Sequence, residues 1–267
     1  MNEANKELVS EHDVQRGGES LTYVLRRPEH PCSLEERLLL ITVGADWKTH
    51  LLTEPYRTTA DGFLANGHYA LSFDIPCHGE RTGPHGEGIN GFRNAWLDGD
   101  DPFERFVRDA AAVIDDCIRL GFAQPGKIAV CGASRGAYMA LRLLAADPRV
   151  VRAAGFAPVT DWRILSEFAP IREAAGLEAL MLHRYADRLA GKPLFLAIGN
   201  RDERVGTLSC CKLYTKLADT NRKLGYPESL VEFYCTDDPG HTMGSRWYNK
   251  GTAFLLNMEG TGGGRHA

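Results

Sequence analysis

A serine between two glycines carries the clearest chemical signal in this sequence. Residues 132–136 read GASRG and fit the pattern G-x-S-x-G, with Ser134 at its centre. The pattern follows an apolar run and precedes a stretch with apolar residues at three- and four-residue spacing, which predicts a strand, a sharp turn and a helix. The two glycines let strand and helix approach closely, and the turn exposes the hydroxyl group. Ser134 is therefore predicted to be a nucleophile.

A serine hydroxyl is a weak nucleophile at neutral pH, so it needs an adjacent base that a third group holds in the correct tautomer. Asp202 follows the apolar run 194–200, and His241 follows the apolar run 230–235. The order Ser…Asp…His, with each residue directly after a predicted strand, places the three side chains at one edge of a parallel sheet. We therefore expect His241 to be the base and Asp202 to orient it.

Each of these assignments has an alternative that the sequence leaves open. Ser134 could be an ordinary turn serine, and Asp202 could cap the helix that begins near residue 207. Asp237 or Asp238 could then supply the acid. Five other histidines do not follow the last predicted strand, which favours His241 as the base: His50, His68, His78, His85 and His183.

The anion that forms when a hydroxyl attacks a carbonyl needs two backbone N–H donors. Arg135, the residue after the serine, would supply one of them, and the helix that begins there points its N-terminal amides at the same place. The second would come from the loop after the third strand, with Ala45 or Asp46 as the donor. Because the Asp46 carboxylate would repel this anion, we expect it to turn away and hydrogen-bond locally.

The elements that must position these groups alternate between strands and helices, which is typical of a mostly parallel sheet with helices on both faces. Apolar runs predict central strands at 37–44, 69–75, 127–132, 153–157, 194–200 and 230–235. Helical periodicity predicts helices near 56–66, 103–120, 135–146, 207–224 and 245–258. Segments 8–14 and 21–27 are expected to be antiparallel edge strands. The predicted fold class is therefore α/β.

A single domain spanning residues 1–267 is expected, because α/β folds reach this length undivided and no repeat or linker interrupts the chain. Residues 1–30 would hold the edge strands, 160–188 a short helical insertion over the sheet edge, and 260–267 a disordered tail. The glycine-rich segment 79–102 is predicted to be a long irregular loop with a functional or mobile role.

Substrate contacts are expected from loops over the carboxyl edge of the sheet. Four aromatic residues fall in these loops and are candidates to line a pocket, with plain packing as the alternative: Trp47, Phe92, Trp96 and Trp162. Arg135, Arg201 and Arg204 lie near the predicted triad positions, where one of them could bind an acidic substrate group. The alternative is that these arginines are solvated or paired with neighbouring carboxylates.

Composition argues against several classes of partner. The chain has 43% apolar and 25% charged residues, as a globular domain does, and its net charge of −4 gives no attraction for nucleic acid or an anionic membrane. Seven scattered cysteines show no metal-site spacing, so we expect a reduced cytoplasmic protein without a bound metal. The N-terminus lacks a secretory pattern, and no apolar stretch reaches the roughly 18 residues of a transmembrane helix. The oligomeric state stays open, with a homodimer as one option.

Four segments together resemble the α/β-hydrolase superfamily, and within it the prolyl-oligopeptidase/dienelactone-hydrolase-like esterases: FDIPCHGER (73–81), GASRG (132–136), GNRDERV (199–205) and DDPGH (237–241). The resemblance covers roughly residue 37 to the C-terminal helix. It implies an eight-stranded sheet, no cofactor, and a catalytic triad at positions that match Ser134, Asp202 and His241.

This chain departs from that family pattern in two places. The loop after the third strand reads Gly-Ala-Asp instead of His-Gly-Gly, and no β-propeller domain precedes the hydrolase region, which favours esterase over peptidase activity. We therefore predict a serine hydrolase that cleaves carboxylic esters of small substrates through an acyl-enzyme on Ser134. One alternative is a carbon–carbon bond or amide/peptide hydrolase with the same triad, since Gly-x-Asp is similar to a branch with carbon–carbon bond hydrolases. Another is a ligand-binding protein with this fold.

Overall fold

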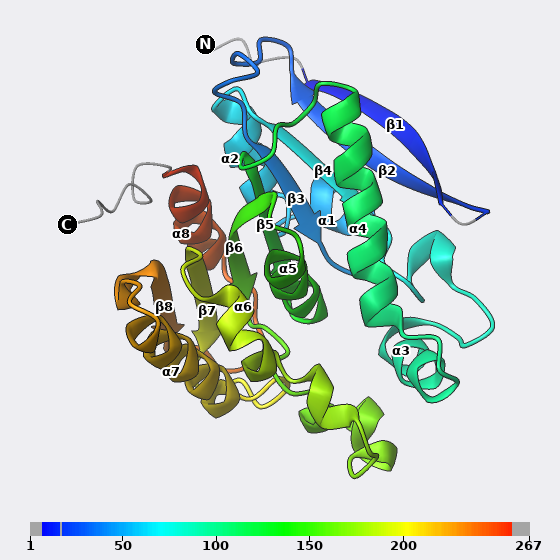
Figure 1. Cartoon of the computed structure of the whole chain (residues 1–267), viewed down its shortest axis with the longest axis vertical. Helices are drawn as coiled ribbons and strands as arrows, with labels where there is room; N and C mark the ends of the chain where they lie inside the picture. The colour runs from blue at the N-terminus through cyan, green and yellow to red at the C-terminus, as the bar shows by residue number, and fades with distance from the viewer. Residues whose placement is uncertain (1–6, 17, 258–267) are drawn as a thin grey trace.

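The computed structural model describes residues 7–16 and 18–257 of the chain. An eight-stranded sheet with the order β1-β2-β4-β3-β5-β6-β7-β8 forms its centre (Figure 1). The six strands from β3 to β8 are parallel, and β2 pairs antiparallel with both β1 and β4. The strands are β1 Glu7–Arg16, β2 Glu19–Pro28, β3 Leu39–Val43, β4 Tyr69–Phe73, β5 Ile128–Ala133, β6 Val150–Phe156, β7 Leu194–Gly199 and β8 Val231–Thr236. The predicted fold class is confirmed.

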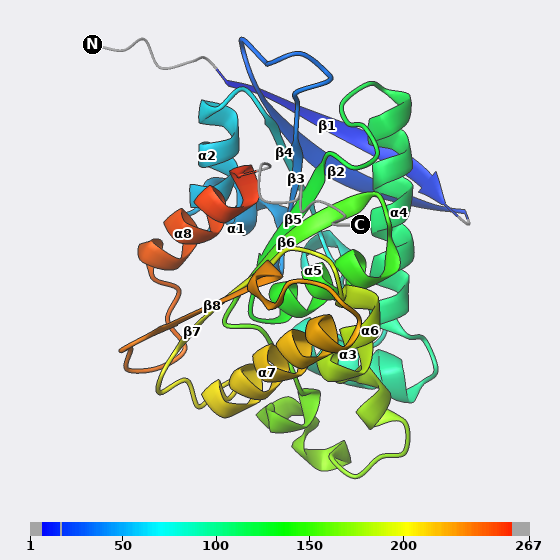
Figure 2. The same ribbon diagram turned by 60° about the vertical axis from the view of Figure 1, so that its left-hand side comes forward.

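Helices cover both faces of this sheet, as predicted. Figure 2 shows α1, α2 and α8 on one side of the strands and α4, α5, α6 and α7 on the other. Residues in β3, β4, β5 and β7 are buried along their whole length, because strands covered on both faces have no solvent side. The helices are α1 Trp47–Leu52, α2 Thr58–Ala65, α3 Gly88–Leu97, α4 Pro102–Arg119, α5 Arg135–Ala146, α6 Ala186–Leu189, α7 Thr207–Lys223 and α8 Ser245–Leu256.

The glycine-rich segment is more regular than its sequence predicts. It contains the short 3-10 helix η1 (Gly79–Arg81) and the ten-residue helix α3. Ile89, Phe92 and Ala95 form the buried face of α3, at the three-residue spacing of a helix that packs on a core. The prediction of a wholly irregular loop at 79–102 is therefore corrected: tertiary burial of this apolar face outweighs the low helix propensity of glycine.

The insertion after β6 consists of short helical pieces, as the sequence suggests for residues 160–188. Four 3-10 helices precede α6: η2 Trp162–Ile164, η3 Ser166–Ile171, η4 Leu177–Leu180 and η5 Leu182–Tyr185. A further 3-10 helix, η6 (Glu228–Leu230), leads into β8. The tail predicted at 260–267 lies outside the described residues. Within the described ranges, none of the helices has the length and apolarity that a membrane crossing requires.

Candidate active site

Ser134 occupies a sharp turn between β5 and α5. Its backbone has φ 55° and ψ −119°, in a region that strains a residue with a side chain. Its N–H donates to the carbonyl of Phe156 at 2.8 Å, which ties the turn to the neighbouring strand β6. The strained turn is therefore held by the sheet, and it lifts the hydroxyl group above the carboxyl end of β5.

The glycines on either side of Ser134 are required by contacts that the structure makes explicit. A Cβ atom on Gly136 would lie 2.0 Å from the carbonyl oxygen of Val43, and one on Gly132 would lie 2.4 Å from the backbone of Gly136. Distances below 3.0 Å mean that backbone would have to move. The first turn of α5 therefore packs directly against the end of β3, beside the loop predicted to complete the anion site.

A continuous chain of hydrogen bonds joins the three predicted residues. The Nε2 atom of His241 lies 3.1 Å from Oγ of Ser134, and its Nδ1 atom lies 2.7 Å from Oδ2 of Asp202. The side chain of Asp202 has no exposed surface, whereas that of His241 is 24% exposed. The structure thus brings together three side chains from the ends of β5, β7 and β8, with the imidazole open to solvent on one side.

Asp202 is fixed by backbone donors on its other carboxylate oxygen. Oδ1 accepts hydrogen bonds from the N–H groups of Arg204 at 3.0 Å and Val205 at 3.1 Å. These bonds lie within the turn before α7. The N-cap of α7 is Gly206, so Asp202 does not cap that helix. Because Oδ1 is committed to the backbone, Oδ2 is the oxygen that faces the imidazole.

The two carboxylates that could replace Asp202, those of Asp237 and Asp238, contact groups other than His241. Asp237 is 80% exposed and pairs with Arg201 and Asn200 at 3.0 Å and 3.1 Å. Asp238 accepts a hydrogen bond from the hydroxyl group of Thr242. Among the described residues, neither carboxylate has a hydrogen bond to His241. The geometry therefore selects Asp202 as the partner of the imidazole.

The predicted anion donors lie at the ends of β3 and β5. Arg135 is the first residue of α5, where backbone N–H groups have no partner inside the helix. In the described part of the chain, no hydrogen bond is found for the N–H groups of Ala45 and Asp46 either. The carboxylate of Asp46 accepts from the backbone N–H and the hydroxyl of Thr49, each at 2.8 Å, which confirms the local hydrogen bonding expected for it.

A second carboxylate joins the two loops beside the site. Asp74, at the end of β4, accepts the N–H of Trp47 at 2.9 Å and the N–H of Glu80 at 2.8 Å. Its Oδ2 atom would lie 2.1 Å from a Cβ atom on Gly79, where the chain has φ +54° and glycine is favoured. Asp74 thus fixes α1 and η1 relative to each other, beneath the loop that carries Ala45.

Two histidines near this loop were not singled out by sequence patterns as parts of the site. Nε2 of His50 lies over Gly44, at 1.5 Å from the position of an added Cβ atom. Burial lowers the pKa of His50 and of His78, in each case to about 4, so both rings are neutral at pH 7. Their placement follows from the packing of α1 and the β4 loop, which residue spacing does not reveal.

The structure corrects the expected role of two aromatic residues. Phe92 and Trp162 are buried, and the indole ring of Trp162 packs against Phe103, Tyr138 and Phe168 at centroid distances of 4.9, 5.0 and 5.2 Å. Because these rings form a core beneath the insertion, neither Phe92 nor Trp162 has surface to offer a substrate in this structure.

The other two predicted pocket residues retain some exposure. Trp47 begins α1, and Trp96 lies near the end of α3 beside Gly176, whose added Cβ atom would lie 3.7 Å from the indole. Both are half-buried against the core. Their contact with a substrate stays a prediction.

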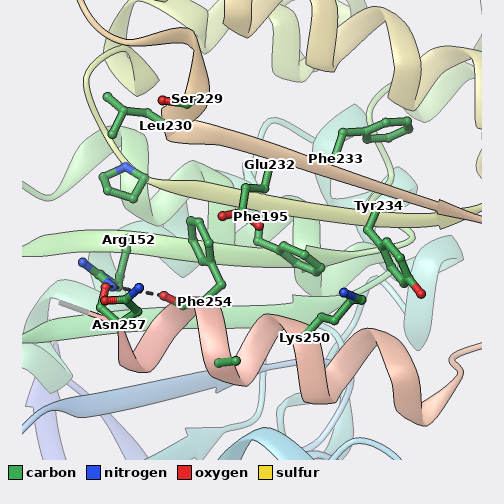
Figure 3. A pocket seen from close by; sticks show the side chains of 12 residues that line it. Arg152, Phe195, Ser229, Leu230, Glu232, Phe233, Tyr234, Lys250, Phe254 and Asn257 are labelled. Atoms are coloured by element: carbon green, nitrogen blue, oxygen red, sulfur yellow. Dashed lines mark hydrogen bonds between the residues drawn. The ribbon is translucent and has the colours of Figure 1, made fainter. Parts of the chain in front are cut away.

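A separate cavity of about 430 Å³ lies between β8 and α8 (Figure 3). The rings of Phe195 and Phe254 lie side by side in its lining at a centroid distance of 5.8 Å, and Arg152 at one end donates to the carbonyl groups that finish α8. None of the three residues of the hydrogen-bonded chain lines this cavity. In addition, residues 7–16 and 18–257 contain no group of three or more His, Cys, Asp or Glu side chains that could hold a metal ion.

A family model matches most of the chain. The sequence model of the alpha/beta hydrolase family matches residues 40–264. Two curated plant proteins match a shorter segment, and both are described as probable chloroplastic glutamyl endopeptidases. The rice protein is 31% identical over 112 residues and the Arabidopsis thaliana protein 32% identical over 113 residues. These alignments cover 40% of this chain but 12% of either plant protein.

Solved structures share the fold over nearly the whole chain. A cold-adapted esterase from an Arctic intertidal metagenomic library has a TM-score of 0.68 at 21% identity and covers 94% of this chain and 92% of its own. A Thermus thermophilus protein has a TM-score of 0.69 at 24% identity, with coverages of 94% and 99%. A puromycin-hydrolyzing peptidase from Mycobacterium tuberculosis has a TM-score of 0.70 at 14% identity, covering 96% of this chain and 39% of its own.

Proposed function

We propose that this chain, which belongs to the alpha/beta hydrolase family, is a serine hydrolase that cleaves carboxylic esters of small substrates through an acyl-enzyme on Ser134. One observation carries the proposal: the hydrogen-bonded chain from Oγ of Ser134 through the His241 imidazole to the buried carboxylate of Asp202. This arrangement supplies a nucleophile, a base and an orienting group in one line.

The geometry supports a two-step reaction. Oγ of Ser134 attacks the ester carbonyl carbon while Nε2 of His241 takes the hydroxyl proton, and the carbonyl oxygen becomes an anion. Backbone N–H groups of Arg135 and of Ala45 or Asp46 would stabilise that anion. The intermediate then collapses: the bond to the alcohol breaks, and His241 returns the proton to the leaving oxygen. A water molecule, deprotonated by His241, attacks the acyl-enzyme and releases the acid and the free serine.

Ester cleavage is the first candidate because esterases are among the solved structures that share this fold, such as the Arctic esterase with a TM-score of 0.68. Peptide hydrolysis is nevertheless a second candidate, because the identity to probable glutamyl endopeptidases exceeds 30% over 112 residues. Both reactions would use the same three side chains.

A covalent probe tests the nucleophile directly. A fluorophosphonate should form a bond between phosphorus and Oγ of Ser134 with loss of fluoride, and mass spectrometry of peptides locates the adduct. Ser134→Ala should lose labelling and lower kcat on 4-nitrophenyl acetate by several orders of magnitude, on the order of 10⁶-fold as in other triad enzymes. Ser229→Ala, an exposed serine in η6, is the matched control and should keep both.

Labelling at another residue, or a Ser134→Ala variant that retains activity, would refute the proposal. A panel of acetyl, longer acyl, lactone and aminoacyl anilide substrates then separates the two candidate reactions. Faster turnover of the anilides than of matched esters would favour the peptidase alternative.

A further inference from the structure

An arginine without a counter-ion lies beside the candidate nucleophile. Arg135 follows Ser134 at the start of α5, and its Nε atom is buried without a hydrogen bond. Throughout residues 7–16 and 18–257, no hydrogen bond or ion pair to its guanidinium group is found. Burial and the nearby charge of Arg204 lower the pKa of Arg135, but a guanidinium group in a protein stays protonated. A positive charge is therefore kept next to the nucleophile.

The carboxylates closest to this charge are already committed. Glu167 and Asp46 both act electrostatically on Arg135. Glu167 accepts two hydrogen bonds from the guanidinium group of Arg204, at 2.6 and 2.8 Å. Asp46 accepts two hydrogen bonds from Thr49 at 2.8 Å. Because neither carboxylate forms an ion pair with Arg135, the guanidinium group has no direct counter-ion among residues 7–16 and 18–257.

The other groups that act electrostatically on Arg135 are Arg204, which is itself a cation, Tyr56, His50 and His78, and none of them is a carboxylate. His50 and His78 interact electrostatically with it, and both rings are neutral at pH 7 because burial lowers their pKa values. Arg135 is half-buried, and a partly desolvated charge without a partner costs free energy, so such groups are normally paired or bind a ligand. Arg135 begins α5 directly after Ser134, in the turn that follows the central strand β5, so this cost falls where a substrate must bind.

We propose that the side chain of Arg135 is an anion subsite of the active site, and that the substrate is an ester that carries a carboxylate close to its scissile bond. This inference rests on the proposed serine hydrolase function. The planar guanidinium group can donate two parallel hydrogen bonds to a carboxylate, which supplies the missing counter-ion. Because Arg135 adjoins the nucleophile, the carboxylate lies within one side-chain length of the attacked carbonyl.

A second role for the same charge can be separated from this one. A cation at this position could act on the anion of the tetrahedral intermediate, which forms with every ester. That role would change the turnover of neutral and anionic esters by the same factor. A substrate subsite changes their ratio. The decisive quantity is therefore the ratio of kcat/KM within a matched pair of substrates.

Two pairs of esters place the carboxylate on either side of the scissile bond. Mono-4-nitrophenyl adipate and its methyl ester differ in the acyl part, and 3-carboxyphenyl acetate and 3-carbamoylphenyl acetate differ in the leaving group. The wild-type chain should prefer the anionic member of at least one pair. Arg135→Met should lower that preference by about tenfold or more, the usual effect of losing a charge-assisted hydrogen bond. Arg135→Lys should lower it less, since it keeps the charge but not the planar fork.

The matched control is Arg201→Met. Arg201 is 61% exposed and pairs with Asp237, in the same turn that carries Asp202. Its removal should leave the ratio of each substrate pair within about twofold of wild type, as expected for an exposed ion pair. An unchanged ratio in Arg135→Met, including equal slowing of both members of each pair, would overturn the inference.

Binding to an inactive variant tests the subsite without turnover. Ser134→Ala should bind one of the two anionic esters saturably in an NMR titration, and Ser134→Ala/Arg135→Met should bind it about tenfold more weakly or worse. Equal affinity in the two variants, or no saturable binding of either anionic ester to Ser134→Ala, would contradict the subsite. If no ester is turned over and Ser134 is not labelled, the proposed hydrolase function fails. The NMR titration then still tests, by itself, whether the Arg135 side chain binds a carboxylate.

Discussion

Replacing Asp202 with asparagine should impair catalysis by reversing a tautomer while leaving the fold intact. Oδ1 of Asp202 accepts two backbone N–H groups, at 3.0 and 3.1 Å, so an asparagine must place its amide oxygen there. Its NH₂ group then faces Nδ1 of His241, 2.7 Å away, and donates to it. Nδ1 becomes an acceptor, so the ring proton moves to Nε2. That nitrogen faces Oγ of Ser134 and can no longer accept its proton.

The expected loss in kcat is about 10⁴-fold, as in triads where the same change has been made. This corresponds to about 5.4 kcal/mol in the activation free energy, at 1.36 kcal/mol for each factor of ten. The rate of fluorophosphonate labelling at Ser134 should fall in parallel, because it depends on the same proton transfer. The melting temperature should change little, since the backbone hydrogen bonds to Oδ1 are kept.

Asp237→Asn and Asp238→Asn are the controls for this change. Both carboxylates belong to the loop before His241 and accept hydrogen bonds from groups other than the imidazole, Asp237 from Asn200 and Asp238 from Thr242. Their kcat values should stay within a few fold of wild type. The reasoning fails if Asp202→Asn keeps more than a tenth of wild-type kcat, or if either control loses as much. Nitrogen-15 chemical shifts of His241 would show directly which ring nitrogen carries the proton.

Two further predictions follow from the packing around the site. Gly136→Ala should destabilise the chain by about 1–3 kcal/mol or more and slow catalysis, because its Cβ atom would lie 2.0 Å from the Val43 carbonyl oxygen. Chemical denaturation measures the free energy of unfolding, with Gly244→Ala as the control because a Cβ atom there meets nothing within 4 Å. Equal stability of the two variants would contradict the prediction. The free energy of unfolding should fall as pH drops from 6.5 to about 4, because the pKa of buried His50 is lowered to about 4 and only the unfolded chain takes up that proton. His50→Gln should flatten this pH dependence by up to about 3 kcal/mol, and an unchanged slope would show that His50 is not buried in the neutral form.

The three side chains in the hydrogen-bonded chain could be predicted because each directly follows a parallel strand. Strand ends are readable from apolar runs, and parallel strands bring their carboxyl ends to one edge. The acid could not be fixed from sequence alone, since Asp237 and Asp238 also follow a strand. Only the backbone donors from Arg204 and Val205 turn Asp202 toward His241.

The burial of Phe92 and Trp162 could not be predicted from the sequence. Phe92 and Trp162 are far apart in the sequence, and nothing in their local patterns reveals that their rings meet at a centroid distance of 5.8 Å. Helix α3 could not be predicted for a related reason. Its glycines lower the local helix propensity, and its apolar face can be recognised only together with the core that it covers. Whether an arginine has a counter-ion likewise depends on tertiary contacts. The position of Arg135 in the sequence therefore does not reveal that its guanidinium group lacks an ion pair.

The aromatic core under Trp162 also bears on how a substrate can enter. If residues 162–189 were to swing outward as a hinged cover, the indole ring of Trp162 would leave contacts with α3, α4 and α5. Exposing an indole of roughly 200 Å² costs about 4–5 kcal/mol, so fewer than about one molecule in a thousand would be open at equilibrium. A substrate should therefore reach the partly exposed imidazole of His241 while this insertion stays packed on the core.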